Sequence, residues 1–195
     1  HKFSSGSHAE GRIAGKNAIR YILDNNTAPN VTDEMVEALK ASTFKPLDTY
    51  EEHKGYTTDP QVNPNYILPR QFMFRLQKIM DEYAGGVSAA FSTNNKQLDR
   101  AMELLGLLKE DSEKLGASSR YELERCWENL HRTMQAESHV RTLQYREETR
   151  WPGYYFRADT PKMDEENWKC FVNCKRDPAT GEWEMLKRPI YSIID

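Results

Sequence analysis

The chain has 195 residues, with 27 basic and 30 acidic side chains and a formal net charge of −3. This near balance provides no global field that would attract nucleic acid or an anionic membrane, so we expect neither as a partner. No apolar run approaches the roughly 20 residues that a membrane-spanning helix needs, and we expect a cytoplasmic protein without a membrane span.

The first predicted element is a helix that begins at Ser7 and ends near Asn25. Ser7 and Glu10 form a capping-box pattern, in which the serine hydroxyl accepts from the backbone N–H of Glu10. Small residues line one side of this helix: Ala14, Gly15 and Ala18. We therefore expect its backbone to press against a flat surface.

The run Ser4-Ser5-Gly6-Ser7 precedes that helix and predicts a turn with open backbone N–H groups. Such a turn, together with the partial positive charge of a helix N-terminus, favours an anion or an electron-rich oxygen. The same residues also fit an ordinary capped surface helix, because glycine-serine turns before helices are common.

A short helix and a long connection are predicted next. Thr32 or Asp33 caps the helix, and Pro46 should end it because proline has no N–H to donate. Residues 48–68 contain two prolines and little periodicity, so we expect an extended connection with at most a short helix near Tyr50.

Three longer helices follow and should pack as an antiparallel bundle. The first begins at Pro69 and ends at Gly85-Gly86, and the second begins at Asn94 or Asn95 and is closed by Gly116. The third is the longest.

The longest predicted helix begins at a second capping box, formed by Ser119 and Glu122, and extends to about Thr149. Arg141, Arg146 and Arg150 resemble a nucleotide-binding patch, but three acidic residues interleave with them: Glu137, Glu147 and Glu148. A solvated face of ion pairs is the favoured interpretation. His131 and His139, eight residues apart on this helix, are interpreted as ordinary surface or core histidines.

Beyond Pro152 the pattern changes from helical to alternating. Trp168, Cys170, Val172 and Cys174 predict one face of a strand, residues 177–181 supply a turn, and a second strand returns through Trp183 and Met185. Cys170 and Cys174 are interpreted as small buried residues, and with Cys126 they make three thiols. Iron–sulfur clusters need about four, so we expect no metal site. A cluster of aromatic residues is interpreted as packing or a subunit interface: Trp151, Tyr154, Tyr155, Phe156 and Trp168.

Together these elements predict a mainly α fold, a helical bundle with a C-terminal β-hairpin. We divide the chain into residues 1–30, a bundle over 31–150, and a C-terminal extended segment and hairpin over 151–195. The chain begins at His1 without an initiator Met, and we expect it to be a piece of a longer protein.

Residues 7–17, Ser7-His8-Ala9-Glu10-Gly11-Arg12-Ile13-Ala14-Gly15-Lys16-Asn17, resemble the last flavin-binding motif of the succinate dehydrogenase and fumarate reductase flavoprotein family. The family pattern runs His-Gly-Ala-Asn-Arg-Leu-Gly-Gly-Asn-Ser-Leu, and His8, Arg12 and Gly15 coincide with it. Residues 150–159, 164–168 and 188–189 resemble the family's closing segment. The resemblance implies that residues 1–30 are the last segment of an FAD-binding domain and that the bundle is the family's C-terminal one.

The resemblance also implies roles for single residues. FAD is the implied cofactor, with six residues along it: Ser5, Gly6, Ser7, His8, Asn17 and Ala18. Arg12 matches a substrate-binding arginine, and a guanidinium suits either a carboxylate or a sulfate-like oxyanion. The alternative is a structural arginine paired within the helix layer. The family's main catalytic His and Arg lie upstream of this region, so we expect no catalytic residue, no activity and no retained FAD in the isolated chain.

Departures from the family pattern bear on the substrate. Glu10-Gly11 replace Ala-Asn, and Asn17-Ala18 stand where Ser-Leu would be, which argues against a succinate or fumarate site. Residues 2–7 and 168–173 are most similar to the branch of the family that acts on adenylylsulfate. That branch implies FAD-dependent conversion of adenylylsulfate to AMP and sulfite, or the reverse, with electrons from a small subunit that carries two [4Fe-4S] clusters. A dicarboxylate-specific flavoprotein and a non-catalytic helical interaction module remain as alternatives.

Overall fold

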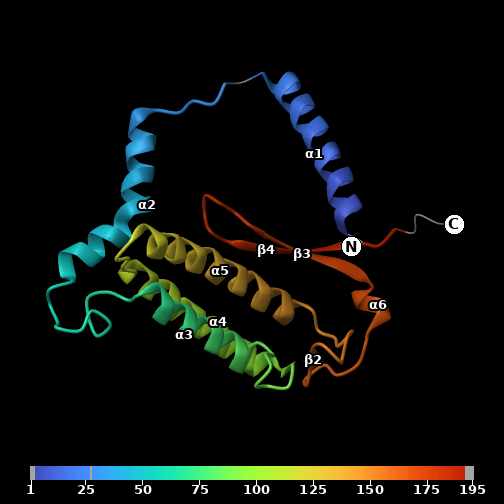
Figure 1. Cartoon of the computed structure of the whole chain (residues 1–195). Helices are drawn as coiled ribbons and strands as arrows, with labels where there is room; N and C mark the ends of the chain where they lie inside the picture. The colour runs from blue at the N-terminus through green and yellow to red at the C-terminus, as the bar shows by residue number, and fades with distance from the viewer. Residues whose placement is uncertain (1–2, 27, 192–195) are drawn as a thin grey trace. The chain divides into compact units, whose positions relative to one another are not determined.

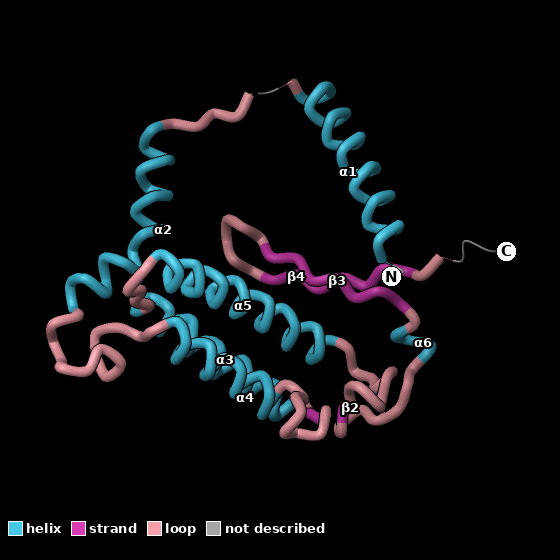
Figure 2. Tube along the Cα trace, viewed as in Figure 1, coloured by secondary structure: helices cyan, strands magenta, loops and turns pink. Residues whose placement is uncertain are grey.

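The computed structural model describes residues 3–26 and 28–191, with side chains from residue 6 onward. Its elements, in chain order, are α1 Phe3–Asn25, α2 Asp33–His53, α3 Pro69–Tyr83, β1 Ser92–Thr93, α4 Asn95–Asp111, the 3-10 turn η1 Ser112–Lys114, α5 Arg120–Tyr145, β2 Phe156–Arg157, α6 Glu165–Trp168, β3 Cys170–Arg176 and β4 Trp183–Pro189 (Figures 1 and 2). The chain divides into two compact units, His1–Ser42 and Thr43–Asp195. The mainly α fold with a C-terminal hairpin is confirmed.

The second unit is built on α3, α4 and α5, which lie side by side and alternate in direction (Figure 1). Its core consists of apolar residues spaced three and four apart on these helices, and the most deeply buried include Phe72, Leu98, Ala101, Cys126 and Val140. Pro69 starts α3 as predicted, and Gly85, with φ of 77°, follows its end. Asn94 caps α4 by accepting from the N–H of Gln97. The predicted antiparallel packing is confirmed.

The C-terminal hairpin pairs β3 with β4 in antiparallel register, with Cys174 opposite Met185. Its turn follows the predicted chemistry, because the Asp177 carboxylate accepts from the N–H groups of Ala179 and Thr180 and Gly181 has a φ of 76°. The hairpin lies along α5 (Figure 2). Trp168 was predicted on the strand but ends the short helix α6, where it is buried.

Two predicted helix limits in the first 53 residues are wrong. The first helix begins at Phe3, so Ser4 to Ser7 form its opening turns and no separate turn precedes it. A single glycine costs a helix only about 1 kcal/mol and this stretch has no proline, so the helix continues toward the N-terminus. Thr32 caps α2, as its hydroxyl accepts from the N–H of Met35 at 3.3 Å, but α2 continues through Pro46 to His53.

Tertiary contacts explain the continuation of α2 and the role of Gly116. Pro46 is buried, and its carbonyl accepts from the N–H of Ala117 at 2.8 Å, contacts that offset the missing helical hydrogen bond. Gly116 does not close α4, which ends at Asp111 before η1. It lies against Tyr66, where an added Cβ would be 2.9 Å from the tyrosine Cβ, so glycine is required by this close approach.

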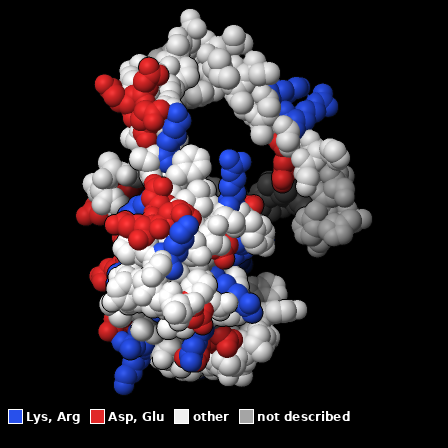
Figure 3. Space-filling model, turned by 60° about the vertical axis from the view of Figure 1, so that its left-hand side comes forward, with Lys and Arg blue, Asp and Glu red and all other residues white. Residues whose placement is uncertain are grey.

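The surface carries mixed charge. Acidic and basic side chains are interspersed on the face drawn in Figure 3. Among the described helices, none is both long and apolar enough to cross a membrane.

Candidate functional site

The residues that the sequence assigns to a cofactor and a substrate all lie on α1. Ser5 is placed only as a helical residue, and the side chains from Gly6 to Asn25 are exposed. Because successive helical residues are rotated by about 100°, four consecutive residues such as 5–8 point in four different directions. The continuous helix therefore does not gather all seven assigned residues on one side.

Helical geometry instead divides the assigned residues among three faces. Ser7 and Ala18, eleven positions apart, differ in direction by only about 20° and share one face. His8 and Arg12, four apart, share the adjoining face, whereas Gly6 and Asn17 lie on a third.

The face that carries Ser7 and Ala18 is made of small residues. Gly11 and Gly15 follow Ser7 at spacings of four, about 40° and about 80° around the helix, and a Cβ added at either glycine would meet nothing within 4 Å. Ile22, which is 66% exposed, ends this side of the helix, whereas Ile13, Ile19 and Leu23 are 60%, 60% and 73% exposed on its other sides. Between Ser7 and Ala18 this face has few protruding atoms, which fits close approach to a flat ring, so the residues of α1 fit a flavin.

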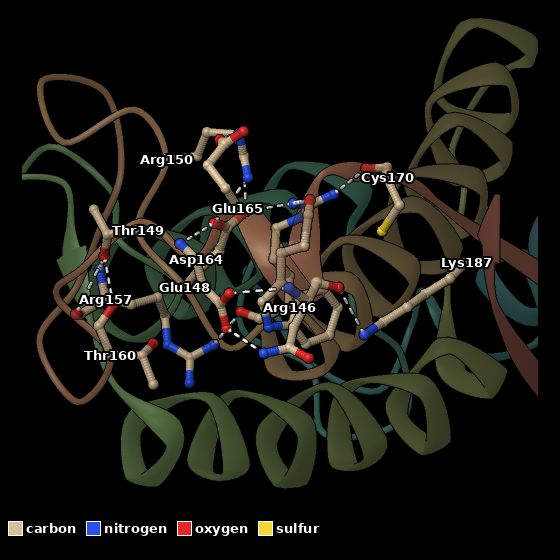
Figure 4. Close-up of polar contacts among 12 residues, drawn as sticks. Arg146, Glu148, Thr149, Arg150, Arg157, Thr160, Asp164, Glu165, Cys170 and Lys187 are labelled. Atoms are coloured by element: carbon tan, nitrogen blue, oxygen red, sulfur yellow. Dashed lines mark hydrogen bonds and ion pairs between the residues drawn. The ribbon is translucent and has the colours of Figure 1, made fainter. Parts of the chain in front are cut away.

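The second unit contains a buried polar cluster that links the end of α5 to the hairpin (Figure 4). Glu148 is 2% exposed and accepts from Arg146 at 2.5 Å and from Arg150 at 2.8 and 3.0 Å. The N–H of Asp164 donates to the same carboxylate at 2.9 Å. Arg146 also donates to the carbonyls of Trp168 and Cys170, at 2.9 and 2.7 Å. The predicted solvated ion-pair face is therefore wrong at Glu148.

The protonation of Glu148 is decided by these donors. Burial alone raises the pKa of the Glu148 carboxyl, but hydrogen bonds from Arg150, the Asp164 N–H and Arg146 outweigh it and hold that pKa below its ordinary value. The cluster is therefore charged at neutral pH and joins three segments of chain through one carboxylate.

Arg157 on β2 is fully buried and closes the other side of the same region. Its guanidinium binds Asp159 through both carboxylate oxygens, at 2.9 and 2.8 Å, and donates to the carbonyls of Leu143 and Arg146 at the end of α5. The hydrogen bond from Arg157 lowers the pKa of Asp159 to about 2. These contacts explain why α5 ends at Tyr145 and not near Thr149. The carbonyls at the end of the helix accept from the Arg157 guanidinium and not from backbone N–H groups of a further helical turn.

The Arg-x-Asp run at 157–159 lies in the segment that resembles the family's closing one, and no separate role was predicted for it. A buried arginine cannot be distinguished from an exposed one by spacing alone. The available signal was the coincidence of arginines and acids within residues 146–159, a segment that is also rich in aromatic residues. Of the aromatic residues predicted to pack or to form an interface, Trp168 is 7% exposed, but Trp151 and Tyr154 are 70% and 81% exposed.

Comparison with known proteins gives a family and a set of relatives. The family model described as "Fumarate reductase flavoprotein C-term" matches residues 74–192. The chain is 48% identical over 194 residues to adenylylsulfate reductase subunit alpha of Megalodesulfovibrio gigas, a match that covers 100% of this chain and 29% of that protein.

Solved structures similar to this chain come from the same kinds of protein. Adenylylsulfate reductase from Archaeoglobus fulgidus is 51% identical with a TM-score of 0.95, over 100% of this chain and 30% of that one. A structure described as adenosine-5-phosphosulfate reductase in complex with sulfite, as a covalent adduct, gives the same values. The FrdA subunit of Escherichia coli quinol fumarate reductase is 18% identical with a TM-score of 0.64, over 95% of this chain and 29% of that one, which shows a shared fold alone. The chain thus spans less than a third of the length of these relatives.

Proposed function

Because the chain belongs to the fumarate reductase flavoprotein C-terminal family, we propose that it forms the C-terminal part of the flavin-bearing subunit of an adenylylsulfate reductase. The whole enzyme would interconvert adenylylsulfate with AMP and sulfite in the cytoplasm. The observation that carries this proposal is the 51% identity and TM-score of 0.95 along the entire chain to the Archaeoglobus fulgidus enzyme. The sequence departures at Glu10-Gly11 and Asn17-Ala18 support the same choice over a dicarboxylate.

The proposed division of labour assigns residues 1–30 to the last segment of the FAD-binding domain, 31–150 to the helical bundle and 151–195 to the closing segment. FAD would supply the two-electron chemistry of the reaction. The cofactor-binding residues would be Ser5, Gly6, Ser7, His8, Asn17 and Ala18. The small face of α1 through Ser7 and Ala18 supports contact with the ring, and Gly6 and Asn17 would need to reach another part of the cofactor.

Arg12 would hold an oxyanion of the substrate. It shares a helix face with His8, next to the small face, so an anion bound there would lie at the border of the ring contact. The guanidinium is planar and permanently charged, and it offers two parallel N–H groups to a sulfate-like oxyanion.

Electrons would come from a small partner subunit that carries two [4Fe-4S] clusters. The described part of this chain contains no group of three or more His, Cys, Asp or Glu residues placed to hold a metal ion. Any cluster that serves this chain would therefore be held by residues elsewhere.

The proposal is tested on the full-length protein purified with its partner. With a reduced viologen as electron donor, we expect adenylylsulfate to yield AMP and sulfite, and fumarate to yield no succinate. Arg12→Gln should raise the KM for adenylylsulfate at least tenfold, because a charge-assisted bidentate contact is lost. The matched control Arg20→Gln, on the same exposed helix, should leave KM unchanged. Succinate formation without AMP formation would replace this proposal by the dicarboxylate alternative, and activity with neither substrate would favour the interaction module.

A further inference from the structure

The C-terminal hairpin is a sheet of only two strands, β3 and β4 (Figure 2). A two-stranded sheet is at best marginally stable by itself in water. Each of its two outer edges presents a row of backbone N–H and C=O groups that can pair with a further strand. What covers each edge therefore decides how the hairpin is completed.

The two edges differ in what covers them. On β3, the Cys170 carbonyl accepts from Arg146 at 2.7 Å (Figure 4), and the strand lies against α5. On β4, the backbone has no hydrogen bond to any described residue outside β3. An open groove of about 500 Å³ lies beside β4, and its lining includes Trp183, Met185 and Lys187 of that strand. In the described chain, the free edge of the hairpin is therefore that of β4.

The other face of β4 carries an acid, a leucine and a base at even spacing. Glu184, Leu186 and Arg188 share this face because side chains alternate along a strand. Glu184 and Arg188 are exposed, and neither forms an ion pair with another described residue, while Leu186 is half-buried. Opposite charges placed two residues to either side of Leu186 make the strand complementary to a second, antiparallel copy of itself.

A two-fold axis at Leu186 gives a register in which every charge finds a suitable neighbour. Glu184 of each strand lies opposite Arg188 of the other, Leu186 lies opposite Leu186, and Met185 lies opposite Lys187. An axis at Met185 would instead place Glu184 opposite Leu186, and an axis at Lys187 would place two lysines opposite each other. Opposite charges across a strand pair are stabilising and like charges are not, so the register centred on Leu186 is favoured.

The residues of β3 extend the same pattern. Lys175 lies opposite Glu184 within the hairpin, and Phe171 lies opposite Arg188. Across four strands, a row would run from Lys175 to Glu184 and on to Arg188 and Phe171 of the second copy, with alternating charges. The two β3 strands would be three strand spacings apart, roughly 14 Å. Packed helices need only about 8–10 Å, so each α5 can lie against its own β3.

We propose that β4 is the contact surface for a second copy of this chain, with the two hairpins joined edge to edge in a four-stranded antiparallel sheet about a two-fold axis at Leu186. Each copy contributes both an acid and a base, as a two-fold interface requires. A strand of one charge sign from another protein would match only one of Glu184 and Arg188. The inference rests on the second unit and is independent of the proposed function.

The test is the association of the full-length protein, purified with its partner subunit, followed by sedimentation velocity over a range of concentrations. We expect a reversible dimer of the complex. Glu184→Arg and Arg188→Glu should each weaken dimerisation at least about tenfold, because two like-charge contacts replace two ion pairs. The double variant Glu184→Arg/Arg188→Glu exchanges the charges and should restore dimerisation to within about threefold.

A control variant separates this effect from a change in net charge. Glu110→Arg reverses an exposed acid near the end of α4 and should leave dimerisation unchanged. Restoration in the double variant also shows that both substitutions are compatible with a folded hairpin.

Three results would overturn the assignment. A complex that stays undimerised at every concentration would show that no second copy binds. Release of the partner subunit by the single variants, without rescue in the double variant, would assign the edge to that subunit. Unchanged dimerisation together with lower thermal stability in all three variants would show that another part of the same polypeptide covers β4.

Discussion

The two units of this chain carry similar apolar helical patterns but differ in what those patterns contact. In the first unit Ile22 and Leu23 on α1 are 66% and 73% exposed, and Leu39 on α2 is 66% exposed. In the second unit Phe72 and Leu98 are fully buried against neighbouring helices. Helix propensity alone is marginal for isolated helices, and most helical stability comes from burial of an apolar face. The second unit therefore supplies its own stability, whereas the described residues of the first unit form no apolar core of their own.

The largest expected consequence is a difference in backbone protection. In the isolated chain, amides of α4 and α5 should exchange with solvent at least about a thousandfold more slowly than those of α1, because core helices open only by global unfolding. Hydrogen exchange read by mass spectrometry on peptides from 6–25 and 95–145 measures this. Equal protection would show that α1 is stable without a partner and would abolish the contrast between the units.

Two leucine substitutions, one in each unit, should differ in their effect on the free energy of unfolding. Leu98→Ala removes a fully buried side chain and should lower the free energy of unfolding by about 4 kcal/mol, from lost transfer energy and a cavity. Leu23→Ala removes a side chain that is 73% exposed and should change it by less than about 0.5 kcal/mol. Urea unfolding of the isolated chain measures both. In the full-length protein Leu23→Ala should become costly, and a cost already present in the isolated chain would contradict the assignment of its contacts to another domain.

The same contrast explains which predictions from sequence succeeded. The start of α3 was predictable because Pro69 has a fixed φ that suits the first helical position, and the start of α4 because Asn94 accepts from the N–H of Gln97 one turn away. The prediction that Pro46 ends its helix was wrong because the helix is held there by a contact with Ala117, 71 positions along the chain. Gly116 likewise serves a contact with Tyr66, not a helix end. Helix limits that are set by residues within one turn can be predicted from sequence, whereas limits that are set by contacts with distant residues cannot.

The candidate site follows the same rule. His8 and Arg12 were identified through a local motif, and their spacing already predicts a shared helix face, but Ser5 and Gly6 lie on the helix only because it begins at Phe3. Nothing in the spacing marked Glu148 or Arg157 as buried, because their burial depends on α6 and on the end of α5.

The buried carboxylate tests whether the second unit depends on polar contacts as well as on its apolar core. Glu148→Gln leaves Arg146 and Arg150 without their shared negative charge and should destabilise the chain by about 3 kcal/mol, less than a fully buried pair because both arginines reach solvent. Glu165→Gln, which removes a half-exposed partner of Arg150, should cost less than about 1 kcal/mol. Urea midpoints of the two variants measure the difference, and equal effects would show that burial of Glu148 has no energetic weight.

The smallest expected effect is on stability at acid pH, and it should arise in the second unit, which contains the Arg157–Asp159 ion pair. The pKa of Asp159 is lowered to about 2 in the folded chain by Arg157, below the roughly 3.9 of an unfolded aspartate. A depressed folded pKa gives stability that is present above pH 4 and is lost as the pH falls from about 4 to about 2, amounting to roughly 2 kcal/mol. Asp159→Asn should remove that part of the pH dependence. Thermal unfolding of the isolated chain between pH 2 and 5 measures it through loss of the bundle's helical signal. An unaltered acid profile in the variant would show that the Arg157–Asp159 pair does not hold β2 against the end of α5.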